Sequence, residues 1–310
     1  MLRRKRPRGV LGLGWACIES AASGRTEHCP TSADYPDTVV RRVSLRAGGG
    51  LPWRISALTS PRAKPAPWKI VVITGSPSWA EYWAPAVAAL PEDREIIVVD
   101  RPGFAGSEPA ECVPEIAVQA RALAPFLKAA RGQKILLVGQ SYGASVATLM
   151  AAAQPRRVNS LALISSYFGE PGPTARWLVA TGSKVLGVIP RDLRNAVLEV
   201  SGHGAQMPSV REALLSVRAP IHLIHGDQDD FAPIDTARRV ANEMATRVPI
   251  RFTSVPGANH FLNDGPTETL LGALEACMPA PALRRQAWRL PSLPDFLKPA
   301  GGLGSATAGA

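Results

Sequence analysis

The sequence predicts an α/β protein in which a mostly parallel central sheet carries helices on both faces. Short apolar runs such as 68–74 and 95–100 alternate along the chain with longer segments of helical composition. These runs are apolar at successive positions, which is typical of strands buried on both sides, and strands separated by helices pair in parallel. The chain has 310 residues and is 46% hydrophobic and 19% charged, which is enough for one sizeable core.

The alternation predicts the order of the elements. An antiparallel hairpin is expected first, from 39–45 and 51–58, because the glycines at 48–50 can adopt the positive φ angles of a tight turn. Further strands are expected at 68–74, 95–100, 135–138, 158–165, 220–225 and 249–255. Helices are expected at 79–90, 115–130, 144–153, 210–217, 235–246 and 266–277.

The alternation pauses between residues 167 and 207. Two helices, at about 174–187 and 191–201, are expected there with no strand between them. An insertion of this kind over the carboxyl ends of parallel strands would form a lid. We therefore expect a core built from 39–166 and 208–278, with 167–207 as a short helical lid.

The two ends of the chain differ from the rest in composition and charge. Residues 1–38 are expected to form a flexible leader, and 279–310 a disordered tail rich in Pro, Ala and Gly. Of the formal net charge of +10, the first eight residues carry +5 and the tail +3. The part between them is nearly neutral, so no basic face for nucleic acid is expected.

The first residues combine a basic head with a short apolar stretch at 10–17. This pattern is similar to an export signal, and Ala16-Cys17 is similar to a bacterial lipoprotein cleavage point. Because the stretch is short and contains two glycines, we favour a cytoplasmic protein, with export or a lipoprotein anchor as the alternative. No run of eighteen apolar residues exists, so no integral membrane span is expected.

The segment 139–143, Gly-Gln-Ser-Tyr-Gly, lies between an apolar strand and a helix of small apolar residues. A serine between two glycines at such a turn matches the nucleophile elbow, G-x-S-x-G. The turn would strain the backbone of Ser141, and a Cβ at Gly139 or Gly143 would collide with the turn or the neighbouring strand. Taken alone, the segment is also compatible with an ordinary connection in which the serine caps the helix.

A serine nucleophile needs a histidine to take its proton and a carboxylate to orient that histidine. His260 is the candidate base, because it follows the last expected strand on a loop at the same edge as the elbow. His28 lies in the leader, and His222 and His225 lie in an apolar strand where a core or edge role is expected. His203 lies in the expected lid, where a substrate contact stays open.

Three aspartates follow the strand at 220–225. Asp229, which has the spacing G-x-x-D-x-x-x-P, is the expected acid, with Asp227 and Asp230 as alternatives. Aspartates after a strand are also common as helix caps or in turns.

The order Ser141, Asp229, His260 is that of the α/β-hydrolase fold. The chain resembles this family from about 51 to 277, and the loop at 100–107 is similar to the D-R-P-G-F-G-x-S loop of many members. The resemblance implies an α/β-hydrolase fold in which the expected strands and lid take their family positions.

The loop at 74–79 resembles the H-G-x-P loop of the family, which supplies one oxyanion donor. By this resemblance, the backbone N–H groups of Ser76 and Tyr142 would form the oxyanion hole. Thr74 stands where histidine is common, which bears on the packing of the loop and not on its backbone donor. The same loop is similar to that of haloalkane dehalogenases and epoxide hydrolases, but these use an aspartate where this chain has Ser141.

The sequence predicts a serine hydrolase that cleaves an ester, thioester, lactone or amide through an acyl-enzyme. Acyl transfer, C–C bond hydrolysis on the same triad and ligand binding without turnover are the alternatives. Trp177 and Pro190 in the lid favour a small, moderately apolar substrate. No metal-ligand spacing and no phosphate-binding loop are present in the sequence, so neither a metal nor a cofactor is expected. The oligomeric state stays open.

Overall fold

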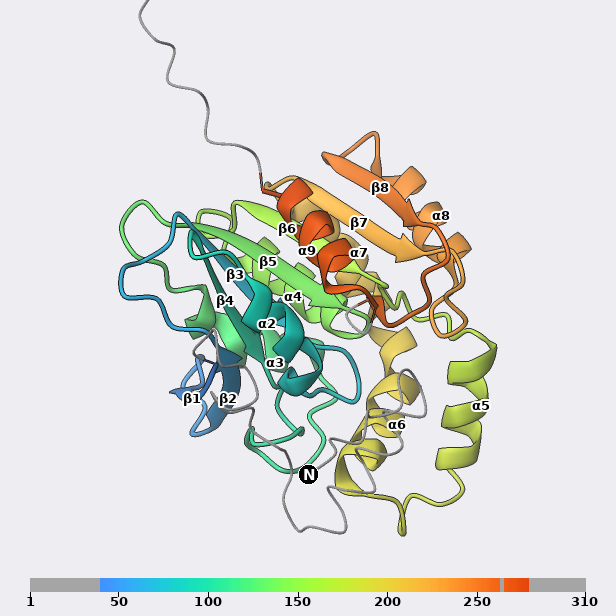
Figure 1. Cartoon of the computed structure of the whole chain (residues 1–310). Helices are drawn as coiled ribbons and strands as arrows, with labels where there is room; N and C mark the ends of the chain where they lie inside the picture. The colour runs from blue at the N-terminus through green and yellow to red at the C-terminus, as the bar shows by residue number, and fades with distance from the viewer. Residues whose placement is uncertain (1–39, 263–264, 279–310) are drawn as a thin grey trace, which may run out of the picture. The chain divides into compact units, whose positions relative to one another are not determined.

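The computed structural model describes residues 40–262 and 265–278, whose strands form one sheet in the order β1-β2-β4-β3-β5-β6-β7-β8 (Figure 1). β1 (Arg41–Arg46) and β2 (Arg54–Thr59) form an antiparallel hairpin, and β2 also pairs antiparallel with β4. The remaining strands are parallel to one another, and they are β3 (Trp68–Ile73), β4 (Arg94–Val99), β5 (Lys134–Gln140), β6 (Ser160–Ile164), β7 (Ile221–Gly226) and β8 (Ile250–Val255).

Helices cover both faces of the sheet. One face carries η1 (Ala80–Trp83), α2 (Ala84–Ala89) and α9 (Thr267–Ala276), of which α2 and α9 lie in front of the sheet in Figure 1. The other face carries α3 (Ile116–Leu123), α4 (Gly143–Ala153), α7 (Met207–Ser216) and α8 (Ile234–Met244).

Alternate residues of the strands supply the two halves of the core. Ile70 and Val72 of β3 pack with α2 and α9, whereas Val71 and Ile73 pack with α3 and α4. Side chains alternate between the faces of a strand, so a strand buried on both sides must be apolar throughout. The expected mostly parallel sheet with helices on both faces is confirmed.

The largest difference from the expected elements concerns the helix at 115–130. The α-helix α3 ends at Leu123, and a 3₁₀ segment η2 (Ala124–Leu127) follows it. Pro125 has no backbone N–H and its ring crowds the preceding turn, so the α-helix cannot continue through it. The chain then turns toward β5.

Residues 165–206, between β6 and α7, contain helices and no strand, and we call them the helical insertion. It contains α5 (Pro173–Gly182), α6 (Arg191–His203) and the short η3 (Gly204–Gln206). In Figure 1, α5 and α6 lie beyond the end of the sheet, as expected for an insertion at one edge. A Cβ at Gly182 would lie 2.6 Å from Val197 Cγ2, so this glycine lets α5 and α6 approach closely.

Helix α6 docks on the core through polar side chains. Asp192, Asn195, Glu199 and His203 are all buried, although they belong to polar residue types. Their spacing of three and four residues places them on one face of the helix. This face meets the loops that follow β3 and β4 and the elbow helix α4.

The partners of these side chains are distributed along the length of α6. Asp192 accepts a hydrogen bond from the indole N–H of Trp79 and another, of 3.1 Å, from the backbone N–H of Ala105. Asn195 Nδ2 donates to the carbonyl oxygen of Gly103 at 2.6 Å. The start and the middle of α6 are therefore fixed to the loop after β4.

His203 fixes the end of α6 to helix α4. Its Nε2 lies 2.9 Å from Ser145 Oγ, and its ring packs against Tyr142 and Tyr167 with centroids 4.8 Å away in both cases. Burial, with a smaller contribution from the positive charge of Arg101, lowers the pKa of His203 to about 4. His203 is fully buried and does not line the cavity described below, so it anchors the insertion.

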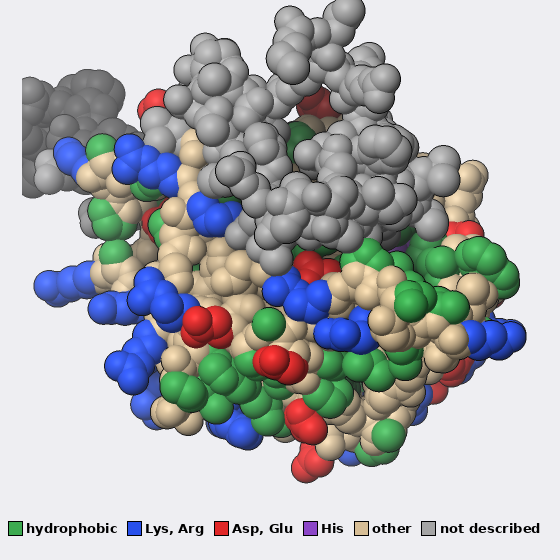
Figure 2. All heavy atoms as spheres, turned by 90° about the horizontal axis from the view of Figure 1, so that it is seen from below, with side chains coloured by type: hydrophobic (Ala, Val, Ile, Leu, Met, Phe, Trp, Pro, Cys, Tyr) green, Lys and Arg blue, Asp and Glu red, His purple; other side chains and the backbone are tan. Residues whose placement is uncertain are grey.

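The two ends of the chain lie outside the described residues. They include the expected leader 1–38 with His28 and the export-like stretch, and the expected tail 279–310. Within the described ranges, no helix is long and apolar enough to cross a membrane. On the face shown in Figure 2, basic side chains are interspersed with acidic and hydrophobic ones.

Acidification is expected to weaken the folded protein through His203. A histidine whose pKa falls on folding binds fewer protons in the folded state, so unfolding becomes easier as the pH drops from 6.5 towards about 4. The free energy of unfolding is expected to fall by about 3 kcal/mol by the time the pH reaches about 4. The variant His203→Gln, which can still hydrogen-bond Ser145, should lose less stability across this range in urea unfolding. Identical pH profiles for the two proteins would contradict this prediction.

Candidate active site

The elbow between β5 and α4 places Ser141 at a sharp turn. The φ angle of Ser141 is 52°, in the left-handed region that non-glycine residues rarely adopt. A Cβ at Gly143 would lie 2.3 Å from the carbonyl oxygen of Ile73, and one at Gly139 would lie 2.5 Å from the Cα of Ala144. Both positions therefore require glycine, for the steric reason expected from the sequence.

His260, on the loop after β8, bridges Ser141 and Asp229. Its Nε2 lies 3.0 Å from Ser141 Oγ, and its Nδ1 lies 2.8 Å from Asp229 Oδ2. A carboxylate only accepts hydrogen bonds, so Nδ1 carries the hydrogen and Nε2 can accept the hydrogen of the serine hydroxyl. His260 is 6% exposed and the side chain of Asp229 is fully buried. The structure thus brings together all three residues of the predicted triad.

The carboxylate of Asp229 is held by four donors. Oδ1 accepts from the backbone N–H groups of Phe231 and Ala232 at 2.9 and 2.8 Å. Oδ2 accepts from His260 and lies 3.1 Å from Nε2 of a second histidine, His225. Burial alone would raise the pKa of Asp229, but the hydrogen bonds from His225, His260 and Ala232 lower it well below its ordinary value. Asp229 is therefore ionised at neutral pH.

His225 lies at the end of β7, and its side chain is fully buried. Its Nε2 lies 2.7 Å from the carbonyl oxygen of Ala232, so this nitrogen carries a hydrogen that is shared with Asp229. His225 has a buried core position, one of the two roles expected for it, but its contact with Asp229 is not evident from the strand pattern. Asp229 therefore lies between two imidazole rings.

The two alternative aspartates contact other parts of the fold. Asp227 Oδ1 accepts from the backbone N–H of Gly257 at 2.8 Å and so joins the loops after β7 and β8. Asp230 accepts a hydrogen bond from the hydroxyl of Thr174 at the start of α5. Both are structural contacts in loops, as expected for aspartates that follow strands.

The loop after β3 lies beside Ser141. A Cβ at Gly75 would lie 3.1 Å from Ser141 Cβ, so this glycine leaves the space in front of the serine open. Ser76 and Tyr142, the expected oxyanion donors, line the same cavity as Ser141. Thr74, which replaces the common histidine, donates to the carbonyl oxygen of Val99 at 2.8 Å and bonds the hydroxyl of Ser78. The threonine therefore packs the loop from within.

A cavity of about 80 Å³ lies beside the triad. It is lined by Thr74, Gly75, Ser76, Pro77, Trp79, Tyr82, Gln140, Ser141, Tyr142, Tyr167, Ala175, Val200, Phe231, His260 and Phe261. A larger chamber of about 270 Å³ adjoins it under α5 and α6, and we call it the apolar chamber. The two spaces share Ser76, Pro77, Ala175, Val200 and Phe231 as lining residues, so the chamber continues from the triad into the insertion.

A family model described as alpha/beta hydrolase fold matches residues 69–208, which include the elbow and the whole of the insertion. The strand order of the sheet, the geometry of the elbow and this match all indicate the same fold. The chain has the α/β-hydrolase fold.

The α/β-hydrolase is similar to 2-hydroxy-6-oxononadienedioate/2-hydroxy-6-oxononatrienedioate hydrolase 2 of Pseudomonas putida, at 24% identity over 204 residues, 54% of this chain and 71% of the relative. Among solved structures it is similar to a membrane phospholipase A described as a bacterial virulence factor, with a TM-score of 0.59 and 20% identity over 86% of this chain and 98% of the other. It is also similar to naproxen esterase from Bacillus subtilis, with a TM-score of 0.59 and 18% identity over 85% and 97%. At these identities the structural matches show the fold alone.

The sequence reading missed the polar face of α6 in this α/β-hydrolase. Asp192, Asn195 and Glu199 were not singled out, because charged and amide side chains on a helix are usually solvated. Their recurrence with His203 at intervals of three and four residues was the available signal.

The strain at Ser141 leads to a stability prediction. The variants Ser141→Gly and Ser141→Ala both lack the hydroxyl, but only glycine adopts a positive φ without steric cost. We expect the glycine variant to be the more stable by about 1 kcal/mol in urea unfolding. If Ser141→Ala is as stable as Ser141→Gly or more stable, the backbone at residue 141 is not strained.

Proposed function

We propose that this α/β-hydrolase is a serine hydrolase that cleaves an ester or related acyl bond of a small, moderately apolar substrate. The observation that carries the proposal is the continuous chain of hydrogen bonds from Ser141 through His260 to Asp229, of 3.0 and 2.8 Å. A serine hydroxyl is a weak nucleophile, and this arrangement is the one that activates it.

In the first half of the reaction, Ser141 Oγ attacks the carbonyl carbon of the substrate while His260 Nε2 takes the hydroxyl proton. The resulting imidazolium is stabilised by the ionised Asp229, which also keeps the hydrogen of His260 on Nδ1. The N–H groups of Ser76 and Tyr142 would bind the oxyanion. Collapse of the tetrahedral intermediate transfers the proton from His260 to the leaving group and leaves an acyl group on Ser141.

In the second half, water takes the place of the leaving group. His260 Nε2 removes a proton from this water, which attacks the acyl carbon of the ester on Ser141. The second tetrahedral intermediate expels Ser141 Oγ, to which His260 returns the proton. The products are a carboxylic acid and the free enzyme, and no redox partner is consumed.

The lining of the two spaces supports an apolar substrate without net charge. Among the described residues that line the cavity and the apolar chamber, none is lysine or arginine. The nearby Arg101 is fully buried and paired with Glu199 at 2.6 Å. An anionic group on the substrate would therefore lose water without gaining a counter-ion, which is costly. Aliphatic side chains of α5 and α6 can take up an acyl chain or a small ring.

C–C bond hydrolysis on the same triad is the second candidate, because several relatives are named for it. The substrate in the name of the Pseudomonas putida relative, a dienedioate, carries two carboxylates. The absence of cations from the described lining weighs against such a dianion here. A C–C substrate with neutral substituents stays compatible with the site.

We further propose that the helical insertion acts as a lid, since residues of α5 and α6 line the apolar chamber and cover it.

The serine mechanism predicts that a fluorophosphonate probe labels the wild-type protein on Ser141. The variant Ser141→Ala should not be labelled, and its kcat with p-nitrophenyl butyrate should fall by about 10⁴-fold or more. Equal labelling of the two proteins, seen by mass spectrometry of the intact chain, would reject Ser141 as the nucleophile.

The apolar chamber predicts a preference for longer acyl chains. The kcat/KM for neutral p-nitrophenyl esters should rise by about fourfold for each added CH₂ group until the chamber is filled. The variant Leu178→Trp, which narrows the chamber, should reduce activity on long esters and leave p-nitrophenyl acetate nearly unaffected. Faster turnover of a dienedioate than of any neutral ester would favour the second candidate instead.

A further inference from the structure

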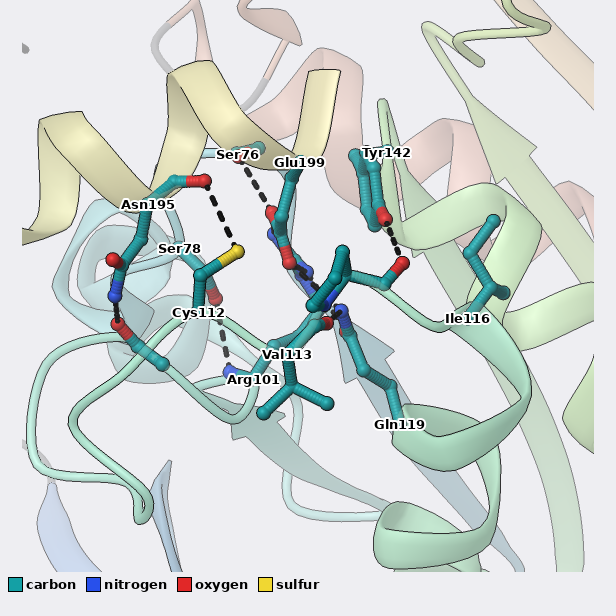
Figure 3. Close-up of polar contacts among 12 residues, drawn as sticks. Ser76, Ser78, Arg101, Cys112, Val113, Ile116, Gln119, Tyr142, Asn195 and Glu199 are labelled. Atoms are coloured by element: carbon teal, nitrogen blue, oxygen red, sulfur yellow. Dashed lines mark hydrogen bonds and ion pairs between the residues drawn. The ribbon is translucent and has the colours of Figure 1, made fainter. Parts of the chain in front are cut away.

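A buried ion pair contacts the loop after β3 (Figure 3). Arg101, on the loop after β4, and Glu199, on α6, are both fully buried. Arg101 Nη1 and Nη2 donate to Glu199 Oε1 and Oε2 at 2.6 and 2.9 Å, the two parallel bonds of a bidentate pair. Gln119 of α3 bonds to both partners. Its Oε1 accepts from Arg101 Nη1 at 2.8 Å, and its Nε2 donates to Glu199 Oε1 at 2.7 Å.

The same guanidinium holds the backbone of the loop after β3. Arg101 Nε donates to the carbonyl oxygen of Thr74 at 2.8 Å, and Nη2 donates to that of Gly75 at 2.6 Å. The carbon at the centre of the guanidinium also lies 4.6 Å from the ring centroid of Tyr142. One side chain thus contacts the loop that precedes Ser76 and the residue that follows Ser141.

Glu199 holds Ser76 from the other direction. Its Oε2 accepts a hydrogen bond from Ser76 Oγ at 2.8 Å. In Figure 3, Glu199 points from α6 toward Arg101, and a dashed line joins it to Ser76. The helical insertion is therefore bonded to the loop after β3 through one carboxylate.

The contact with Gly75 fixes the direction of the Ser76 N–H. The carbonyl of Gly75 and the N–H of Ser76 belong to one planar peptide unit, which is not among the cis peptides of the described chain. In a trans peptide the C=O and the N–H point in opposite directions. When Arg101 holds the carbonyl on its own side, the N–H must point away from Arg101.

We propose that Arg101, held in place by Glu199, is a positioning residue that aims the Ser76 N–H at the substrate oxyanion. The inference rests on the proposed serine mechanism, in which this N–H is one oxyanion donor. A buried ion pair gives little net stability compared with well-packed apolar side chains, but it fixes geometry because both partners lose most of their freedom. Oxyanion donors act only when their direction is already correct, and this pair maintains that direction.

The test removes both charges together, because removal of one would leave the other buried without a partner. The double variant Arg101→Met/Glu199→Gln should show a kcat with p-nitrophenyl acetate that is lower by about 10²-fold, with KM changed by less than about threefold. Its affinity for a trifluoromethyl ketone, which forms a tetrahedral oxyanion on serine, should fall by a similar factor. Circular dichroism and urea unfolding establish that the variant is folded.

Asn195→Leu is the matched control. Asn195 anchors the same helix to the loop after β4 but does not contact the loop after β3. This control should keep kcat and ketone affinity within about threefold of the wild type. If the double variant does not fold, Arg101→Lys takes its place, because it keeps the charge opposite Glu199 but lacks the planar fork that holds carbonyl and carboxylate together.

Two outcomes would overturn the positioning role. One is a folded double variant, or Arg101→Lys, with wild-type kcat and ketone affinity. The other is an equal loss in Asn195→Leu, which would mean that loosening of the insertion is the cause. Hydrogen–deuterium exchange of the peptide that contains 74–76 tests the same contact without activity, and faster exchange is expected in the double variant. If the wild type shows no Ser141-dependent turnover while the exchange result holds, the serine mechanism fails and the backbone contact stands.

Discussion

The ion pair between Arg101 and Glu199 is the interaction through which helix α6 reaches the loop after β3. Most helices pack on a sheet through apolar side chains, but α6 presents Asp192, Asn195, Glu199 and His203 to it. Apolar contacts are nearly independent of direction, so a helix held by them can slide or turn at small cost. Hydrogen bonds depend on distance and angle, and the four side chains that make them along one face fix both the rotation and the height of α6. On this face Glu199 contacts Ser76 and Arg101, whereas Asn195 contacts the loop after β4 and not the loop after β3.

The triad shows the same use of polar contacts to restrict freedom. Asp229 has partners on both oxygens, so it cannot rotate away from His260 without losing bonds to Phe231 and Ala232. His225 adds a second imidazole N–H to this carboxylate from within the sheet. The ring of His260 is further confined by Phe231, whose centroid lies 5.1 Å away. His260 is thus oriented by groups from two adjacent loops and one strand.

The sequence predicted the sheet because its strands depend on local pattern, and it indicated Ser141, Asp229 and His260 because each follows a strand at one edge of that sheet. Continuous apolar runs such as 68–74 specify buried strands. The elbow has glycines at 139 and 143 because a Cβ at either position would collide with neighbouring backbone atoms. The sequence did not predict the role of His225, because a strand pattern gives burial but not which loop folds back over the strand end. Nor did it predict Glu199, since its partner Arg101 is 98 residues away and nothing local distinguishes a buried carboxylate from a solvated one.

Helix α6 carries two rows of residues, and each row has a different role. The polar row docks the helix, whereas Leu193, Ala196, Val197 and Val200 from the same turns line the apolar chamber. The shape of the apolar chamber and the attachment of α6 to the core therefore depend on different positions of a single helix. Substitutions along the second row would change the shape of the apolar chamber while the contacts that hold α6 in place stay intact, so the two properties can evolve separately.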